Sequence, residues 1–284
     1  MKHVMACIDG SAAATTVCDY AAWASVRLAA PLTFLHVLDE HKYPQAPSNL
    51  SGNIGLGSRE NLLEELAALD EQRGKLAREQ GQFLLDAAKQ RVDQIGIVHP
   101  YTRQRHGELV DCLKALENEI RLLVIGRNGE ASEVLSEHIG SHVESVIRTL
   151  QRPILLTPVG FTKPQRFLIA YDGSETGHKS IKMIATSPLL KGLDCHLLMV
   201  GVDSSHAWDQ LNWAKEQLQD AGLNVTVLVR AGEVERVIQD YIQEQRIDLL
   251  IMGAYGHSRI RQFLVGSTTS NMLRKTSVPL LLLR

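Results

Sequence analysis

Cysteines are few in this sequence, and none is spaced as a metal-binding or redox pair. The 284 residues include only Cys7, Cys18, Cys112 and Cys195, with no CxxC spacing. This pattern does not predict a disulfide framework or a thiolate zinc site. Free cysteine commonly packs as a small apolar core residue, so we expect buried thiols, with a reactive thiol as the open alternative.

Long apolar runs and a charge excess of one sign are also lacking. No run approaches the roughly 20 apolar residues that cross a bilayer, and residues 1–10 enter a strand pattern without the apolar core of a signal peptide. Lys plus Arg total 30 against 32 Asp plus Glu, so no global basic field points to nucleic acid or an anionic membrane. We expect a cytoplasmic protein without a membrane or nucleic-acid partner.

One structural unit is written twice in the chain. Residues 2–11 read KHVMACIDGS and residues 166–174 read RFLIAYDGS, each an apolar strand that runs into Asp-Gly-Ser. Further on, HGELVDCLKALENEIRLLVIG (106–126) matches AGEVERVIQDYIQEQRIDLLIMG (231–253). The last strands match as well, with RPILLTP at 152–158 and VPLLLLR at 278–284. The sequence therefore predicts two copies of one fold.

The order of elements in each copy predicts an α/β fold of two tandem doubly wound open parallel-sheet domains, Rossmann-like and similar to adenine nucleotide alpha hydrolases. Strands and helices alternate, and strands such as 249–252 are continuous apolar runs, which suits parallel strands covered on both faces. We place the domains at 1–159 and 165–284. The first copy carries about 38 extra residues, which predict a loop at 43–57 and a long helix at 59–92 that Gly74 and Gly81 weaken.

A glycine-rich pattern in the second copy predicts a phosphate site. The strand at 249–252 ends in Gly253, and Gly256 follows three residues later. After nine intervening residues, Gly266, Ser267 and Thr268 are expected to open a helix. Glycine lets a phosphate approach the backbone, and a helix start presents free amides to an anion. The nine-residue bridge holds Arg259 and Arg261 and no acid, which favours a polyphosphate.

Asp172, at the end of the strand that begins the second copy, is expected beside the same crevice. The first and fourth strands of such a sheet flank its topological switch point, where ligands bind. Its carboxylate could accept a hydrogen bond from a base amine or a ribose hydroxyl. The alternative for Asp172 is a cap of the following helix, and for the glycines it is an ordinary loop and helix start.

These residues give the chain a resemblance to the universal stress protein family. The G-x-x-G, nine residues, G-[ST] pattern after a buried strand, with a distant Asp after the first strand, looks like that family, and the duplication is similar to its tandem members. The resemblance implies an ATP or ADP site, with Mg²⁺ as a candidate companion of the phosphates beside Ser267. The implied nucleotide-binding residues are Asp172, Val200, Met252, Gly253, Gly256, Gly266, Ser267 and Thr268.

The first copy departs from this pattern and is expected to bind ATP weakly or not at all. Ten residues, not nine, separate Gly129 from Gly140, and that bridge carries three glutamates, Glu130, Glu133 and Glu137, with no Lys or Arg. Like charges in a partly desolvated site cost several kcal/mol. The first domain therefore has a degenerate phosphate loop and the second an intact one.

Two functions remain open from the sequence. We expect a nucleotide-dependent stress-response regulator or binding module with no catalytic or metal-ligating residue of its own, because no base that would activate water and no Walker A motif is evident. The alternative is a slow ATPase or phosphotransferase that uses the same loop, with His257 as the local candidate base. The final apolar strands of the two copies could pair in an intrachain pseudo-dimer. A homodimer and an unidentified protein partner stay open.

Overall fold

The computed structural model describes residues 1–38, 56–127, 141–253 and 276–284. In the two helices that begin at Leu56 and Ser141, side chains are described from Glu65 and from Val143 onward, respectively. Each copy forms its own run of strands and helices. The first consists of β1 His3–Cys7, α1 Ala14–Leu28, β2 Leu32–Leu38, α2 Leu56–Asp93, β3 Tyr101–His106, α3 Leu109–Ala115, the short 3-10 helix η2 Glu117–Glu119, β4 Ile120–Gly126, α4 Ser141–Thr149 and β5 Ile154–Thr157. The second consists of β6 Arg166–Ala170, α5 Glu175–Thr186, the 3-10 helix η4 Pro188–Leu190, β7 Asp194–Val200, α6 Ser205–Asp220, β8 Asn224–Arg230, α7 Val234–Gln245, β9 Leu249–Gly253 and β10 Leu280–Leu283.

The strands of both copies join into one ten-stranded sheet within the described part of the chain. Its order is β3-β2-β1-β4-β5-β10-β9-β6-β7-β8, and within each copy neighbouring strands are parallel. The same order, third-second-first-fourth-fifth, thus occurs twice. The predicted fold class is confirmed.

The two copies meet through their last strands. β5 and β10 pair antiparallel, with Leu281 opposite Leu155 and Leu282 opposite Ile154. The residues of both strands are fully buried, because each is a continuous apolar run with no edge left to solvent. This seam makes the chain the intrachain pseudo-dimer that the sequence predicts. Because β5 and β10 are antiparallel, the parallel strands of the two copies run in opposite directions. The edge of the sheet at which the strands of one copy end is therefore the edge at which those of the other copy begin.

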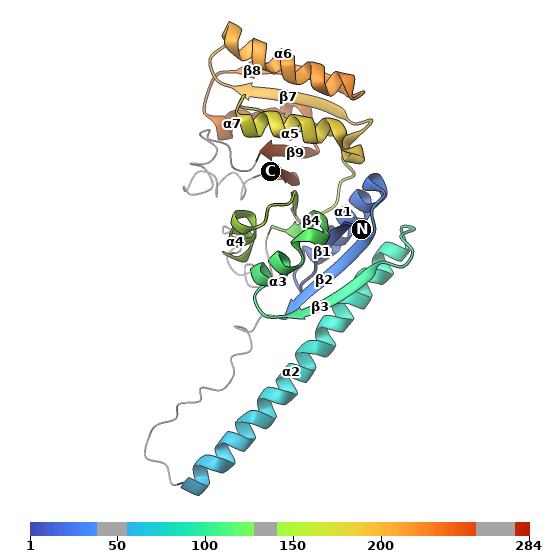
Figure 1. Ribbon diagram of the computed structural model, residues 1–284, viewed down its shortest axis with the longest axis vertical. Coiled ribbons are helices and arrows are strands. Elements are labelled where there is room, and N and C mark those ends of the chain that lie inside the picture. The colour runs from blue at the N-terminus through green and yellow to red at the C-terminus, as the bar shows by residue number, and fades with distance from the viewer. Residues whose placement is uncertain (39–55, 128–140, 254–275) are drawn as a thin grey trace.

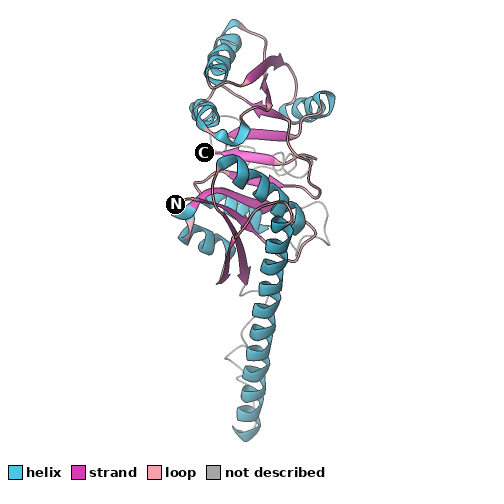
Figure 2. Cartoon of the chain, turned by 90° about the vertical axis from the view of Figure 1, so that its right-hand side faces the viewer, coloured by secondary structure: helices cyan, strands magenta, loops and turns pink. Residues whose placement is uncertain are grey.

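Helices cover the sheet on both faces (Figure 2). Residues of α1, α2, α5 and α6 share one buried cluster with alternate strand residues such as Val4 and Phe167. Residues of α3, α4 and α7 share the other cluster with the intervening strand residues, such as Met5 and Leu168. The alternation along each strand therefore builds two cores, one per face.

The extra residues of the first copy form α2, which extends well beyond the rest of the molecule (Figure 1). Its 38 residues correspond to about 57 Å at the helical rise. The predicted long helix is confirmed, and its carboxyl-terminal half packs on α1, β2 and β3. Among the described residues, no helix is both long enough and apolar enough to cross a membrane. The cytoplasmic location stays a prediction.

Candidate functional site

The switch point of the second copy brings two of the predicted residues to one edge of the sheet. β6 pairs with β9 in parallel, with Ala170 opposite Met252. Asp172 follows β6 by two residues, and Gly253 is the last residue of β9. The carboxyl ends of parallel neighbours meet at the same edge, so Asp172 and Gly253 lie side by side there.

The turn after β6 fixes the carboxylate of Asp172. The backbone N–H of Ser174 donates to Asp172 Oδ1 at 3.0 Å, and Gly173 supplies the positive φ of 69° that this tight turn requires. The Ser174 hydroxyl in turn accepts from the N–H of Gly177 at 3.0 Å and caps α5. Ser174, rather than Asp172, is therefore the helix cap, and Asp172 is an oriented carboxylate at the edge of the sheet.

A small polar cavity lies between the ends of β6 and β9 and the first turns of α5. Its walls come from Ile169, Ala170, Tyr171, Asp172, Ser174, Thr176, Gly177, Ser180, Ile251 and Gly253. Its volume of about 10 Å³ holds the centre of one water molecule. The space between the described residues is therefore too small for a nucleotide.

Among the described residues, the hydroxyl of Ser180 is a free hydrogen-bonding group in this cavity, available to a ligand or a water molecule. Ser180 is buried, and its hydroxyl has no hydrogen-bond partner among the described residues. A Cβ on Gly253 would lie 3.2 Å from that hydroxyl, so the glycine keeps the space beside it open. A buried hydroxyl without a partner costs about 1 to 3 kcal/mol, which a bound polar group would recover.

Tyr171 forms the inner wall of the cavity and stays neutral. Burial, and then the negative charge of Asp172, raise the pKa of its hydroxyl well above the usual value. That hydroxyl lies 3.4 Å from His178 Nε2, and His178 Nδ1 lies 2.8 Å from the Ser174 carbonyl oxygen. Both ring nitrogens of His178 therefore contact neighbours within the fold.

The other predicted site residues divide into two groups. Val200 ends β7, beside β6 and at the same edge, but it is not part of the cavity wall described above. The side chain of Met252 is buried in the apolar cluster on the α7 side, so only its main chain can face this edge. The remaining predicted residues, Gly256, Gly266, Ser267 and Thr268, lie outside the described residues, as do His257, Arg259 and Arg261.

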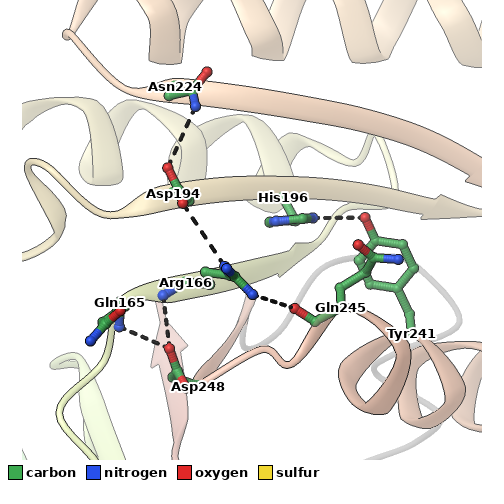
Figure 3. Close-up of polar contacts among 8 residues, drawn as sticks. All are labelled: Gln165, Arg166, Asp194, His196, Asn224, Tyr241, Gln245 and Asp248. Carbon is green, nitrogen blue, oxygen red and sulfur yellow. Dashed lines mark hydrogen bonds and ion pairs between the residues drawn. The ribbon is translucent and has the colours of Figure 1, made fainter.

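The opposite edge of the second copy is tied by a polar network (Figure 3). Asp248 Oδ2 accepts from the backbone N–H groups of Gln165 and Arg166, at 2.9 and 3.0 Å. The Arg166 side chain donates to the Gln245 carbonyl at 3.3 Å and lies 3.9 Å from Asp194. These contacts fix the starts of β6, β7 and β9 to one another, so the strand register that sets the site is held from both ends.

The first copy has the corresponding Asp-to-Ser backbone contact, with different surroundings. Asp9 Oδ1 accepts from the N–H of Ser11 at 3.1 Å, as Asp172 does in the second copy. Arg127, which follows the last residue of β4, is buried and crosses the seam, where it donates to the carbonyl oxygens of Thr276 and Val278, the latter at 3.0 Å. Burial lowers its pKa to about 10. The three glutamates of the degenerate loop lie outside the described residues.

Neither a reactive thiol nor a metal-binding cluster is indicated by the described residues. All four cysteines are free, with Cys18 and Cys195 buried. Burial raises the pKa of Cys7 and of Cys18 to about 12, so neither forms a nucleophilic thiolate near neutral pH. No cluster of three His, Cys, Asp or Glu side chains suited to a metal occurs within the described ranges.

Sequence reasoning missed the contribution of α5 to the cavity. Thr176, Gly177 and Ser180 line it from the first turns of that helix. Their signal was available, because Ser174, Gly177 and Ser180 are small residues three apart, a spacing that keeps one helix face free of bulk.

Comparison with known proteins decides the family. The Universal stress protein family matches residues 1–158 and 201–284 of the chain. The chain belongs to the universal stress protein family. One relative, Universal stress protein Slr1230 from Synechocystis sp., is 37% identical over 287 residues that span all of both chains. The family and the tandem organisation predicted from the sequence are confirmed.

Solved structures share the fold of this universal stress protein over its whole length. A universal stress protein from Archaeoglobus fulgidus superposes with a TM-score of 0.64 at 18% identity and covers 99% of this chain and 96% of its own. A putative universal stress protein from Pseudomonas aeruginosa gives a TM-score of 0.61 at 13% identity, covering 100% and 93%. At such low identity the likeness shows the fold alone.

Proposed function

We propose that the second copy binds an adenine nucleotide, ATP or ADP, at the edge between β6 and β9. The observation that carries this proposal is that the oriented carboxylate of Asp172, the glycine that ends β9 and the unpartnered hydroxyl of Ser180 lie close together where β6 and β9 end. Nucleotide occupancy would then set the conformation or partner surface of a stress-response regulator.

Each residue of the site has a defined task in this proposal. Asp172 accepts a hydrogen bond from the base amine or a ribose hydroxyl, while the main chain of Val200 lies next to the base. The main chain of Met252 and Gly253 allows close approach of the ribose and first phosphate. By sequence position, Gly256, Gly266, Ser267 and Thr268 supply amides and hydroxyls to the phosphates, and Ser267 would meet Mg²⁺. The second domain, 165–284, thus carries the working loop, and the first, 1–159, the degenerate one.

Binding without rapid turnover fits the described residues best. His178, the histidine closest in sequence to the turn after β6, contacts the Ser174 carbonyl and the Tyr171 hydroxyl through its two ring nitrogens. It is thereby held in place rather than directed at a ligand as a general base. A slow ATPase or phosphotransferase would have to rely on His257, Arg259 or Arg261. Turnover of ATP above about one per second would favour that alternative.

The direct test is to identify the small molecules released when the purified protein is denatured, together with calorimetry against ATP and ADP. We expect an adenine nucleotide and saturable binding in the wild type. Gly177→Ala is a sharp variant, because its Cβ would lie 2.9 Å from Asp172 Oδ1 and displace that carboxylate. We expect its affinity to fall about tenfold or more, which corresponds to at least 1.4 kcal/mol, and Gly266→Asp to abolish binding. Saturable binding by neither ATP nor ADP at millimolar concentration would contradict the proposal.

A further inference from the structure

Helix α2 carries a row of apolar side chains on the face turned away from the body of the protein. Leu69, Leu76 and Phe83 are 49%, 57% and 74% exposed, respectively. They are spaced seven residues apart, which in an α-helix puts them on one line along the axis, drifting by about 20° per step. We call these three residues the exposed stripe.

The body-facing side of the same helix is already occupied. Its buried row begins at Ala77 and continues through Gly81, Leu85, Ala88 and Val92. At about 100° per residue, the exposed stripe lies some 140° around the helix from this row. The exposed stripe therefore does not contribute to the core of the chain that carries it.

The amino-terminal part of α2 projects from the body, as both views show (Figures 1 and 2). From Glu65 to Leu76 every described side chain is exposed or half-buried. Most helical stability in proteins comes from packing an amphipathic face, and a helix without such support is marginal in water. Gly74, for which an added Cβ would meet nothing within 4 Å, lowers the helix propensity further.

Charge is divided along this projecting segment in a self-complementary way. Residues 65–71 hold Glu65, Asp70 and Glu71 and no basic residue, a charge of −3, whereas residues 73–78 hold Arg73, Lys75 and Arg78 and no acid, a charge of +3. Arg73 lies 3.9 Å from Asp70 where the two blocks meet. Two such helices side by side attract when antiparallel, because each acidic block faces a basic one, and repel when parallel.

We propose that two copies of this chain associate through the exposed stripe, with their α2 helices antiparallel about a two-fold axis near Gln72. A seven-residue apolar spacing supplies one of the two apolar positions per heptad in a two-stranded helical contact, and a two-fold axis makes one self-complementary surface serve both partners. The seam strands β5 and β10 are paired within the chain, so this second contact lies at a separate place on the molecule. It extends beyond nucleotide binding and does not depend on it.

Sedimentation velocity of the full chain from 1 to 100 μM tests the proposal. We expect a concentration-dependent dimer in the wild type. In Leu69→Glu/Leu76→Glu we expect the dissociation constant of the dimer to be at least tenfold larger. The matched control is Ala68→Glu/Gln82→Glu, which adds the same charge at exposed positions of α2 off the stripe and should dimerise about as the wild type does. A wild type that stays monomeric at 100 μM, or a stripe variant that dimerises as tightly as the control, would overturn the proposal.

Orientation has its own test. Arg73→Glu/Lys75→Glu/Arg78→Glu makes both blocks acidic and should weaken an antiparallel dimer at least tenfold. Mixing this chain with one that carries Glu65→Lys/Asp70→Lys/Glu71→Lys should restore the association in either orientation, and so tests whether the charged blocks act between chains. If the first variant dimerised as well as the wild type, the antiparallel arrangement would be wrong. Helicity by circular dichroism confirms in each variant that the helix still forms, and all substituted side chains lie outside the buried row.

Discussion

Asp9 and Asp172 occupy corresponding positions in the two halves of the molecule. Each follows the first strand of its copy and accepts a hydrogen bond from the backbone N–H two residues later, at 3.1 Å for Asp9 and 3.0 Å for Asp172. The two positions share their backbone role and differ in their surroundings. They therefore form a matched pair for separating a structural role from a ligand-binding role.

Replacing Asp172 with Ala should weaken nucleotide binding by about tenfold or more, since a hydrogen bond to a charged group contributes about 1.5 to 3 kcal/mol. The loss of the turn contact to the Ser174 N–H should cost roughly 1 kcal/mol of folding stability. Titration calorimetry gives the first quantity and urea denaturation the second.

Asp9→Ala is the control, because it removes the corresponding backbone contact, together with the bond from the Ser11 hydroxyl, from the copy that we expect not to bind ATP. Its folding stability should fall by a similar amount, while the nucleotide affinity of the chain stays unchanged. Equal losses of affinity in the two variants would mean that the carboxylates act on the fold and not on a ligand.

Gly74 and Gly81, both within α2, should respond in opposite directions to substitution by Ala. A Cβ on Gly81 would clash with Gln104 Nε2 and lie 2.5 Å from His36 Cδ2, and His36 is held by a 2.8 Å contact between its Nδ1 and the Ile8 carbonyl oxygen. Overpacking of this kind costs about 1 to 3 kcal/mol. Gly74→Ala meets no neighbour and should stabilise by about 0.5 to 1 kcal/mol through helix propensity. Thermal denaturation should show the two shifts with opposite sign.

Arg127→Met should weaken the seam between the two halves. The guanidinium donates to the carbonyls of Thr276 and Val278 across it, and hydrogen bonds to charged groups contribute about 1.5 to 3 kcal/mol each. Met carries no charge, so the variant avoids the cost of burying a guanidinium, the same burial that lowers the Arg127 pKa. This offsets part of the lost hydrogen-bond energy, and we expect folding stability to fall by about 2 kcal/mol. Urea unfolding measures it, with Arg236→Met, at an exposed arginine, expected within about 0.5 kcal/mol of the wild type. If Arg127→Met changed stability as little as Arg236→Met, the hydrogen bonds from Arg127 to Thr276 and Val278 would contribute nothing to folding stability.

Acid should destabilise the protein through His196. Burial, and next the positive charge of Arg166, lower the pKa of this imidazole below its ordinary value of 6.5, against the opposing effect of Asp194. The unfolded chain therefore takes up the proton first, and folding stability falls as the pH drops through 6.5 toward the folded pKa. In His196→Gln the loss of stability over this range should be smaller, as measured by urea midpoints between pH 7.5 and 5.5. An unchanged pH profile would remove His196 from the account.

Repetition made the architecture predictable from one sequence. Asp-Gly-Ser follows an apolar strand at both Asp9 and Asp172, and the final strands are largely apolar. The fold class, the neighbouring positions of Asp172 and Gly253 and the pairing of the final strands therefore follow from local pattern plus the known winding of such sheets. The family resemblance rested on the same residues.

Side-chain contacts across distant parts of the chain could not be read in this way. Nothing in the sequence around Arg127 indicates that it reaches Thr276 and Val278, about 150 positions later, because that contact exists only once the two sheets have joined. The unpartnered hydroxyl of Ser180 likewise depends on how closely α5 approaches β9. That Ser174, and not Asp172, caps α5 depends on backbone angles that the sequence does not show.

The measurement that bears most directly on the central claim is the stoichiometry of ATP binding to the full chain by titration calorimetry, repeated with Asp172→Ala and Asp9→Ala. We expect one nucleotide per chain in the wild type and in Asp9→Ala, and at least tenfold weaker binding in Asp172→Ala. Two equivalent sites, or one site that survives Asp172→Ala and disappears with Asp9→Ala, would contradict it.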